Sequence, residues 1–217
     1  VQATVKRTPE KLANRLGLDP EDVRRTVLIA THEVAAFDGL IDLMTGQDRT
    51  RRGWLDKTPR NCEVYPRLAA RSSDLVFVSV IRHGLDTVTS RILTHPRKAT
   101  EYWCSIQRFV DSMTAIRAFD HDRHLIVRYE DLIADPAATV ARIHEFAGLS
   151  TSADDTAAWT PLPADHPLAQ RQPMLAEGID RTRVGRWAEP EHADRVAEFL
   201  ARDDACELMR SFGYDLP

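Results

Sequence analysis

The segment from Leu75 to Ile81 constrains the fold of this chain most strongly, because all of its residues except Ser79 are apolar and three are valines. A short continuous apolar run rich in β-branched residues is typical of a strand that is buried on both faces. The run ends at Arg82, after which His83 and Gly84 turn the chain. Apolar residues then recur at helical spacing, so the segment predicts a strand, a tight turn and a helix.

Arg82 stands where a ligand-binding residue is expected. In open α/β sheets, ligands bind beyond the carboxyl ends of the strands. A guanidinium at such a position offers a rigid pair of donors that can hold a phosphate through two hydrogen bonds. Ser90 follows eight residues later, about two turns into the predicted helix. The pattern therefore predicts a phosphate contact at Arg82.

Composition excludes several classes of protein. The chain has 217 residues, of which 43% are apolar and 29% charged, as expected for a soluble globular protein with one substantial core. Its net charge of −4 argues against a nucleic-acid partner. We find no apolar run near the ~18 residues of a membrane span and no signal peptide at the first residues. The three scattered cysteines, Cys62, Cys104 and Cys206, indicate free thiols in a reducing compartment, so we expect a cytoplasmic protein.

Helical patterns dominate the first part of the chain. Thr8 and Pro9 begin a short helix that Gly17 ends. Acidic residues after Asp19 begin a second, long helix, and its apolar stripe continues to Met44, before Gly46. We then expect a short strand at 54–55 and a helix over 59–70.

A second strand is predicted at Leu125–Val127, after a long helix over 103–119. Two strands separated by helices imply a parallel βαβ arrangement. Asp135 and Pro136 begin a further helix that Gly148 ends. The segment 151–190 holds five of the 12 prolines and is predicted to be a functional loop or lid. We therefore predict a single domain made of a helical part (1–53), an α/β nucleotide-binding part (54–150), a loop or lid (151–190) and C-terminal helices (191–217).

Several motifs occur together and in a fixed order. They are Asp56-Lys57-Thr58-Pro59, the strand that ends at Arg82 with Ser90 eight residues on, Val127-Arg128-Tyr129-Glu130-Asp131-Leu132, Asp135-Pro136, and Arg183-Val184-Gly185-Arg186-Trp187. With these motifs the chain resembles the sulfotransferases that use 3′-phosphoadenosine 5′-phosphosulfate (PAPS), most of all the bacterial and tyrosylprotein-type enzymes. The resemblance runs from about Trp54 to the C-terminus. It implies transfer of a sulfuryl group to a hydroxyl of a small molecule or peptide, with 3′,5′-adenosine bisphosphate (PAP) as the product.

The resemblance implies a role for each matched residue. Arg82 and Ser90 match the pair that holds the 3′-phosphate, and Tyr129 matches the tyrosine at the adenine side. Arg183 and Gly185 match the C-terminal loop that covers the nucleotide. Lys57 matches the catalytic lysine near the transferred group. Because sulfuryl transfer resembles phosphoryl transfer, positioning and cationic stabilisation are expected to provide most of the catalysis.

The chain departs from this family at two places. The expected fold is a helix-rich α/β fold with a P-loop-like parallel sheet flanked by helices, but the N-terminal strand and its phosphosulfate loop are missing from this sequence. Either the sequence lacks an N-terminal portion or the protein is a degenerate relative. In addition, His83-Gly84 replaces the Asp-Pro of many relatives, which changes the turn but keeps Arg82 in place.

Other interpretations remain open at this stage. A relative that kept the fold and lost the loop could act as a non-catalytic binding or scaffold protein. A nucleotide kinase-like enzyme would need a Mg²⁺ site and a Walker lysine, and we predict no metal ligands. His32 and Glu33 could supply a catalytic base, but a solvated face of the long helix explains them better, and we assign no base. The sequence determines neither the acceptor nor the oligomeric state.

Overall fold

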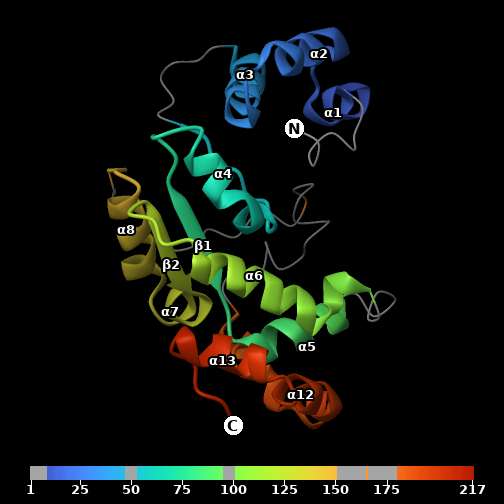
Figure 1. Cartoon of the computed structure of the whole chain (residues 1–217), viewed down its shortest axis with the longest axis vertical. Helices are drawn as coiled ribbons and strands as arrows, with labels where there is room; N and C mark the ends of the chain where they lie inside the picture. Colours follow the sequence, from blue (N-terminus) through green and yellow to red (C-terminus); the bar gives the residue numbers. More distant parts are fainter. Residues whose placement is uncertain (1–8, 47–52, 95–100, 151–164, 166–179) are drawn as a thin grey trace. The chain divides into compact units, whose positions relative to one another are not determined.

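The computed structural model describes residues 9–46, 53–94, 101–150, 165 and 180–217 (Figure 1). The chain divides into two compact units, residues 1–75 and residues 76–217, which are described separately below. The predicted single domain therefore stays a prediction. Most of the predicted loop or lid lies outside the described residues.

The first unit begins with three helices, α1 (Pro9–Leu16), α2 (Pro20–Ile29) and α3 (Glu33–Thr45). Asp19 caps α2, because its carboxylate accepts hydrogen bonds from two backbone N–H groups of the first turn. Ala13, Val23 and Leu40, one residue from each helix, form a buried cluster. The amphipathic stripes predicted from the sequence thus pack against one another.

The prediction of one long helix from Asp19 was wrong, since the chain leaves the helical conformation between α2 and α3. Ala30 has an extended backbone, and His32 is the N-cap of α3. The His32 Nδ1 accepts a hydrogen bond of 3.2 Å from the backbone N–H of Ala35. This bond satisfies one of the donors left unpaired at the start of a helix. His32 is therefore a capping residue and does not lie on the face of a continuous helix.

The predicted strand at 54–55 is also absent, because both residues lie in irregular backbone. Trp54 is held by side-chain contacts instead: its Nε1 donates to Asp38 at 2.7 Å, and its ring stacks on Phe37. Leu55 is 86% exposed. The predicted helix over 59–70 is divided into a 3₁₀ turn, η1 (Asn61–Val64), and a short helix, α4 (Tyr65–Ala69).

The second unit contains a two-stranded parallel sheet, as predicted. Strand β1 (Phe77–Ile81) pairs with β2 (His124–Arg128), and Ile81 lies opposite Arg128. The described part of the crossover between them contains α5 (Gly84–Thr94), a 3₁₀ turn η3 (Tyr102–Cys104) and α6 (Ile106–Ala118). Both strands end at the same edge of the sheet, which brings the residues after Ile81 close to those after Arg128 (Figure 1).

The expectation that β1 is buried on both faces was wrong for one face. Phe77, Ser79 and Ile81 are buried, but Val80 on the opposite face is 53% exposed. In the part of the chain that the structure describes, β1 has one hydrogen-bonded neighbour, and the face of Val80 is left partly uncovered. Alternating burial is what a strand covered on one face shows.

Helices follow the second strand and close the chain. These are α7 (Tyr129–Ala134), α8 (Pro136–Phe146), α12 (Ala193–Leu200) and α13 (Asp203–Ser211). Within residues 180–192, just before α12, the backbone forms three 3₁₀ turns: η4 (Arg181–Arg183), η5 (Arg186–Ala188) and η6 (Pro190–His192). Helix α12 contacts α5, and α13 contacts α6, so the C-terminal helices pack on the crossover.

Gly84 begins α5 where the C-terminal helices approach closely. An added Cβ would lie 2.6 Å from Phe199, 2.8 Å from the Met209 sulfur and 2.9 Å from Phe109. Both Phe199 and Phe109 are buried, and they contact each other. The position therefore accepts only glycine without repacking.

We expect Gly84→Ala to destabilise the protein by about 1–3 kcal/mol, the usual cost of overpacking a filled core. Denaturant-induced unfolding measures this difference. Gly53→Ala is the matched control, because nothing lies within 4 Å of a Cβ added there. Equal stability of the two variants would contradict the packing described for Gly84.

Candidate functional site

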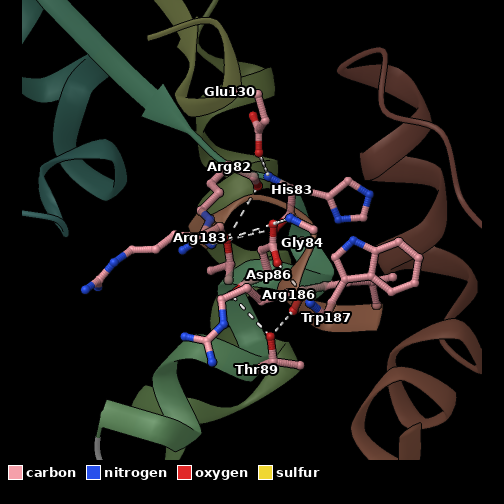
Figure 2. Close-up of polar contacts among 12 residues, drawn as sticks. Arg82, His83, Gly84, Asp86, Thr89, Glu130, Arg183, Arg186 and Trp187 are labelled. Carbon is pink, nitrogen blue, oxygen red and sulfur yellow. Dashed lines mark hydrogen bonds and ion pairs between the residues drawn. The ribbon is translucent and has the colours of Figure 1, made fainter. Parts of the chain in front are cut away.

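A pocket lies at the start of α5, at the edge where both strands end. Its lining residues come from the turn after β1, from α5 and from the 3₁₀ turns before α12: Arg82, Asp86, Thr89, Ser90, Arg183 and Arg186. Figure 2 labels all of them except Ser90. Three of these side chains are guanidinium groups and one is a carboxylate. The pocket is therefore suited to an anion.

Arg82 follows β1, and other residues hold its guanidinium in place. The group lies over the ring of Tyr129, 4.9 Å from the ring centroid. One terminal nitrogen donates to the backbone carbonyl of Arg183 and lies 3.6 Å from the Asp86 carboxylate. The Arg82 Nε is buried and has no hydrogen-bond partner among the described residues. A buried donor without a partner is costly, and the described residues do not supply a partner for this N–H.

Asp86 connects α5 to the segment that follows η4. Its side chain is only 1% exposed. One carboxylate oxygen accepts from the backbone N–H of Gly185 at 2.8 Å, and the other accepts from the N–H of Trp187 at 3.1 Å. With Arg82 beside it, this buried carboxylate is both paired and hydrogen-bonded, as a buried charge requires.

Gly185 allows the segment to bend at this point. Its φ is +81°, a left-handed conformation that favours glycine because it has no Cβ. The bend presents the N–H groups of Gly185 and Trp187 to the same carboxylate. The glycine of the Arg-Val-Gly-Arg-Trp motif is therefore required by the backbone conformation at this position.

Arg183 and Arg186 line the pocket while pairing with carboxylates of their own segment. The Arg183 Nε donates to Asp180 at 2.9 Å, and the Arg186 Nε donates to Glu189 at 3.0 Å. Hydrogen bonds from Thr182 and then Arg183 lower the pKa of Asp180, and the hydrogen bond from Arg186 lowers the pKa of Glu189. Figure 2 shows the three guanidinium groups on one side of Asp86.

A second group of contacts supports the turn that contains His83, directly after β1. The ring of His83 stacks on Trp187, with 5.7 Å between ring centroids (Figure 2). The backbone N–H of His83 donates to one carboxylate oxygen of Glu130 at 2.9 Å, and the hydroxyl of Tyr214 donates to the other oxygen at 2.8 Å. Burial, followed by this bond to Glu130, raises the pKa of Tyr214. Glu130 therefore binds a backbone N–H group and supports the turn after β1.

The structure brings together most of the residues predicted for the site. Arg82, Ser90 and Arg183 line the pocket, Tyr129 lies beneath Arg82, and Gly185 binds Asp86. Their roles toward a ligand stay predictions. Lys57 belongs to the first unit, where it is exposed, and its neighbours Asp56 and Thr58 are joined by a hydrogen bond of 2.9 Å.

The sequence analysis missed three residues of the pocket: Asp86, Thr89 and Arg186. The hydroxyl of Thr89 donates to the carbonyl of Leu85 at 2.8 Å, within α5. For Asp86 one signal was available, since it lies four residues after Arg82 and can therefore form an ion pair along the start of a helix.

The chain belongs to the sulfotransferase family, whose model matches residues 2–154. No curated protein matches the chain by sequence.

Two solved structures have a similar fold. The sulfotransferase domain of the olefin synthase from Synechococcus PCC 7002 has a TM-score of 0.57 at 20% identity, and the match covers 97% of this chain and 76% of that one. The sulfotransferase domain from the curacin biosynthetic pathway has a TM-score of 0.61 at 16% identity, with 91% and 80% covered. The helix-rich α/β fold with a small parallel sheet is therefore confirmed. Within the described residues, no helix combines the length and apolarity of a membrane span.

We expect Asp86→Asn to lower the free energy of unfolding by about 1–3 kcal/mol, because an amide has one acceptor oxygen for two N–H groups. The amide protons of Gly185 and Trp187 should exchange faster with solvent, which hydrogen-exchange measurements detect. Asp122→Asn is the control, since Asp122 is exposed. Unchanged exchange at both amides would contradict the linking role of Asp86.

Proposed function

We propose that this protein transfers the sulfuryl group of PAPS to a hydroxyl of a small molecule or peptide. Membership of the sulfotransferase family supports the reaction class. The observation that carries the assignment of the donor is the pocket at Arg82, which gathers three guanidinium groups at the carboxyl end of a parallel strand.

The charge of the pocket is suited to the 3′-phosphate of PAPS. A phosphate monoester carries a charge of about −1.5 to −2 at pH 7. Three guanidinium groups and one carboxylate give the lining itself a formal charge of +2, counted as 3 − 1, while Asp180 and Glu189 pair with two of the guanidinium groups from outside the lining. The unpartnered Arg82 Nε supplies a buried donor, and the hydroxyl of Ser90 supplies a further polar group.

The other predicted residues would position the rest of the nucleotide. We assign Tyr129 to the adenine side, next to the guanidinium that it already contacts. Arg183 and Gly185 belong to the segment anchored on Asp86, and this segment would cover the nucleotide. The hydrogen bonds to Asp86 would hold this segment in place before the nucleotide binds. This lowers the entropic cost of ordering the segment on binding.

Lys57 would act on the transferring group. When bound, PAPS supplies the sulfuryl group and a phosphate leaving group. The ammonium of Lys57 would stabilise negative charge that develops on the bridging and leaving oxygens. A compact charge suits this single contact, whereas the guanidinium of Arg82 suits a bidentate one. PAP would remain in the pocket as the product.

We also propose that the protein is located in the cytoplasm.

We expect Arg82→Ala to weaken PAP binding by about 10- to 150-fold, the equivalent of about 1.5–3 kcal/mol for a charge-assisted contact. Calorimetry on the full chain measures the change. Arg82→Lys should restore part of the affinity, because it returns the charge without the bidentate geometry. Arg117→Ala is the control, since Arg117 is paired with Glu207 on the surface. Equal affinity for PAP in the wild type and Arg82→Ala would exclude the phosphate assignment.

For Lys57→Ala we expect a loss of sulfuryl transfer of about 100-fold or more, comparable to the loss of one stabilising donor in other enzymes. Binding of PAP should change little. Lys11→Ala removes a lysine from α1 and serves as the control. A wild-type chain that binds PAP yet transfers nothing to any hydroxyl acceptor would favour the alternative, a non-catalytic binding protein.

A further inference from the structure

Three potential metal ligands lie together outside the pocket, in the turn that precedes α12. They are Glu189, Glu191 and His192, and one ligand atom from each lies within 4.8 Å of the other two. Pro190 begins η6 between the two glutamates, and His192 ends it. The short 3₁₀ turn places all three side chains on one side of the backbone, so the grouping is a consequence of local geometry.

His192 is the unusual member of this cluster. The residue is only 7% exposed, and its Nε2 is buried without a hydrogen-bond partner among the described residues. This nitrogen lies 3.7 Å from an oxygen of Glu189 and 3.9 Å from an oxygen of Glu191. Both distances are too long for a hydrogen bond. The imidazole nitrogen thus faces two carboxylates without bonding to either.

These separations suit a metal ion placed between the groups. With metal–ligand bonds of about 2.1 Å and tetrahedral angles, neighbouring donor atoms lie about 3.4 Å apart. The two separations from the His192 nitrogen exceed this value by a few tenths of an ångström, and the glutamate oxygens lie within 4.8 Å of each other. Rotation of the exposed Glu191 side chain would bring the three ligands closer together. Two carboxylates would also balance the charge of a divalent cation.

We propose that Glu189, Glu191 and His192 form a binding site for Zn²⁺. An imidazole nitrogen with two carboxylates favours zinc over Mg²⁺ and Ca²⁺, which prefer oxygen ligands alone. With three protein ligands, the fourth position is left to water. None of the three ligands lines the pocket proposed for the nucleotide, although Arg186 lines that pocket and also binds Glu189. The site differs from the prediction of a chain without metal ligands.

Arg186 competes with the metal for one of the ligands. Its Nε and a terminal nitrogen donate to the two oxygens of Glu189, at 3.0 and 3.2 Å. The oxygen that accepts the 3.2 Å bond is the one that faces His192. Removal of the guanidinium therefore frees this oxygen and removes a positive charge beside the site, so Arg186→Ala should bind zinc more tightly.

The test is calorimetric titration of Zn²⁺ into the full chain free of added histidines, with Co²⁺ absorption as a probe of tetrahedral coordination. We expect one saturable site that excess Mg²⁺ or Ca²⁺ does not displace. Glu191→Gln should weaken zinc binding on the order of 100-fold, and because Glu191 is 62% exposed this change should not disturb folding. His192→Gln should have a similar effect.

Glu145→Gln is the matched control, since it removes an exposed glutamate from α8 and should leave zinc affinity unchanged. Absence of a saturable site, or equal zinc affinity in Glu191→Gln and Glu145→Gln, would overturn the proposal. Unchanged or weaker affinity in Arg186→Ala would contradict Glu189 as a ligand. No nucleotide is present in these titrations, so their outcome is independent of the proposed sulfotransferase activity.

Discussion

The buried carboxylate of Asp86 is the interaction on which the candidate site depends. It joins the turn after β1 and the adjoining helix α5 to the segment around Gly185, which lies about 100 residues further along the chain. Without it, the N–H groups of Gly185 and Trp187 would have to find other partners, and Arg82 would lose its neighbouring charge. Because a buried charge is tolerated only when it is paired and hydrogen-bonded, Asp86 and its partners stabilise one another.

The resulting pocket differs from a simple cluster of surface arginines. Arg82 is 22% exposed and is held by an aromatic ring, a backbone carbonyl and a carboxylate. Each contact limits the positions of the guanidinium, while its Nε stays without a partner among the described residues. A pre-positioned cation loses less side-chain entropy when a ligand binds than a mobile one does. This is the physical reason to regard the pocket as a binding site.

Sequence alone predicted the parts of this fold that depend on local pattern. The apolar run before Arg82 predicted β1, and the helical spacing after it predicted α5. The motifs that contain Arg82, Ser90 and Arg183 lie together as the resemblance implied. The break at His32 was missed because N-caps are usually Ser, Thr, Asp or Asn, and the importance of Asp86 was missed because its backbone partners lie 99 and 101 residues away.

The central claim is that the pocket at Arg82 recognises a 3′-phosphate. Comparison of the affinities of the wild-type chain for 3′,5′-adenosine bisphosphate and for adenosine 5′-phosphate, at one salt concentration, tests this most directly. The two ligands differ only in the 3′-phosphate. The account predicts that the bisphosphate binds at least about 10-fold more tightly, as expected for a charge-assisted contact in a partly buried pocket. Equal affinities would contradict it.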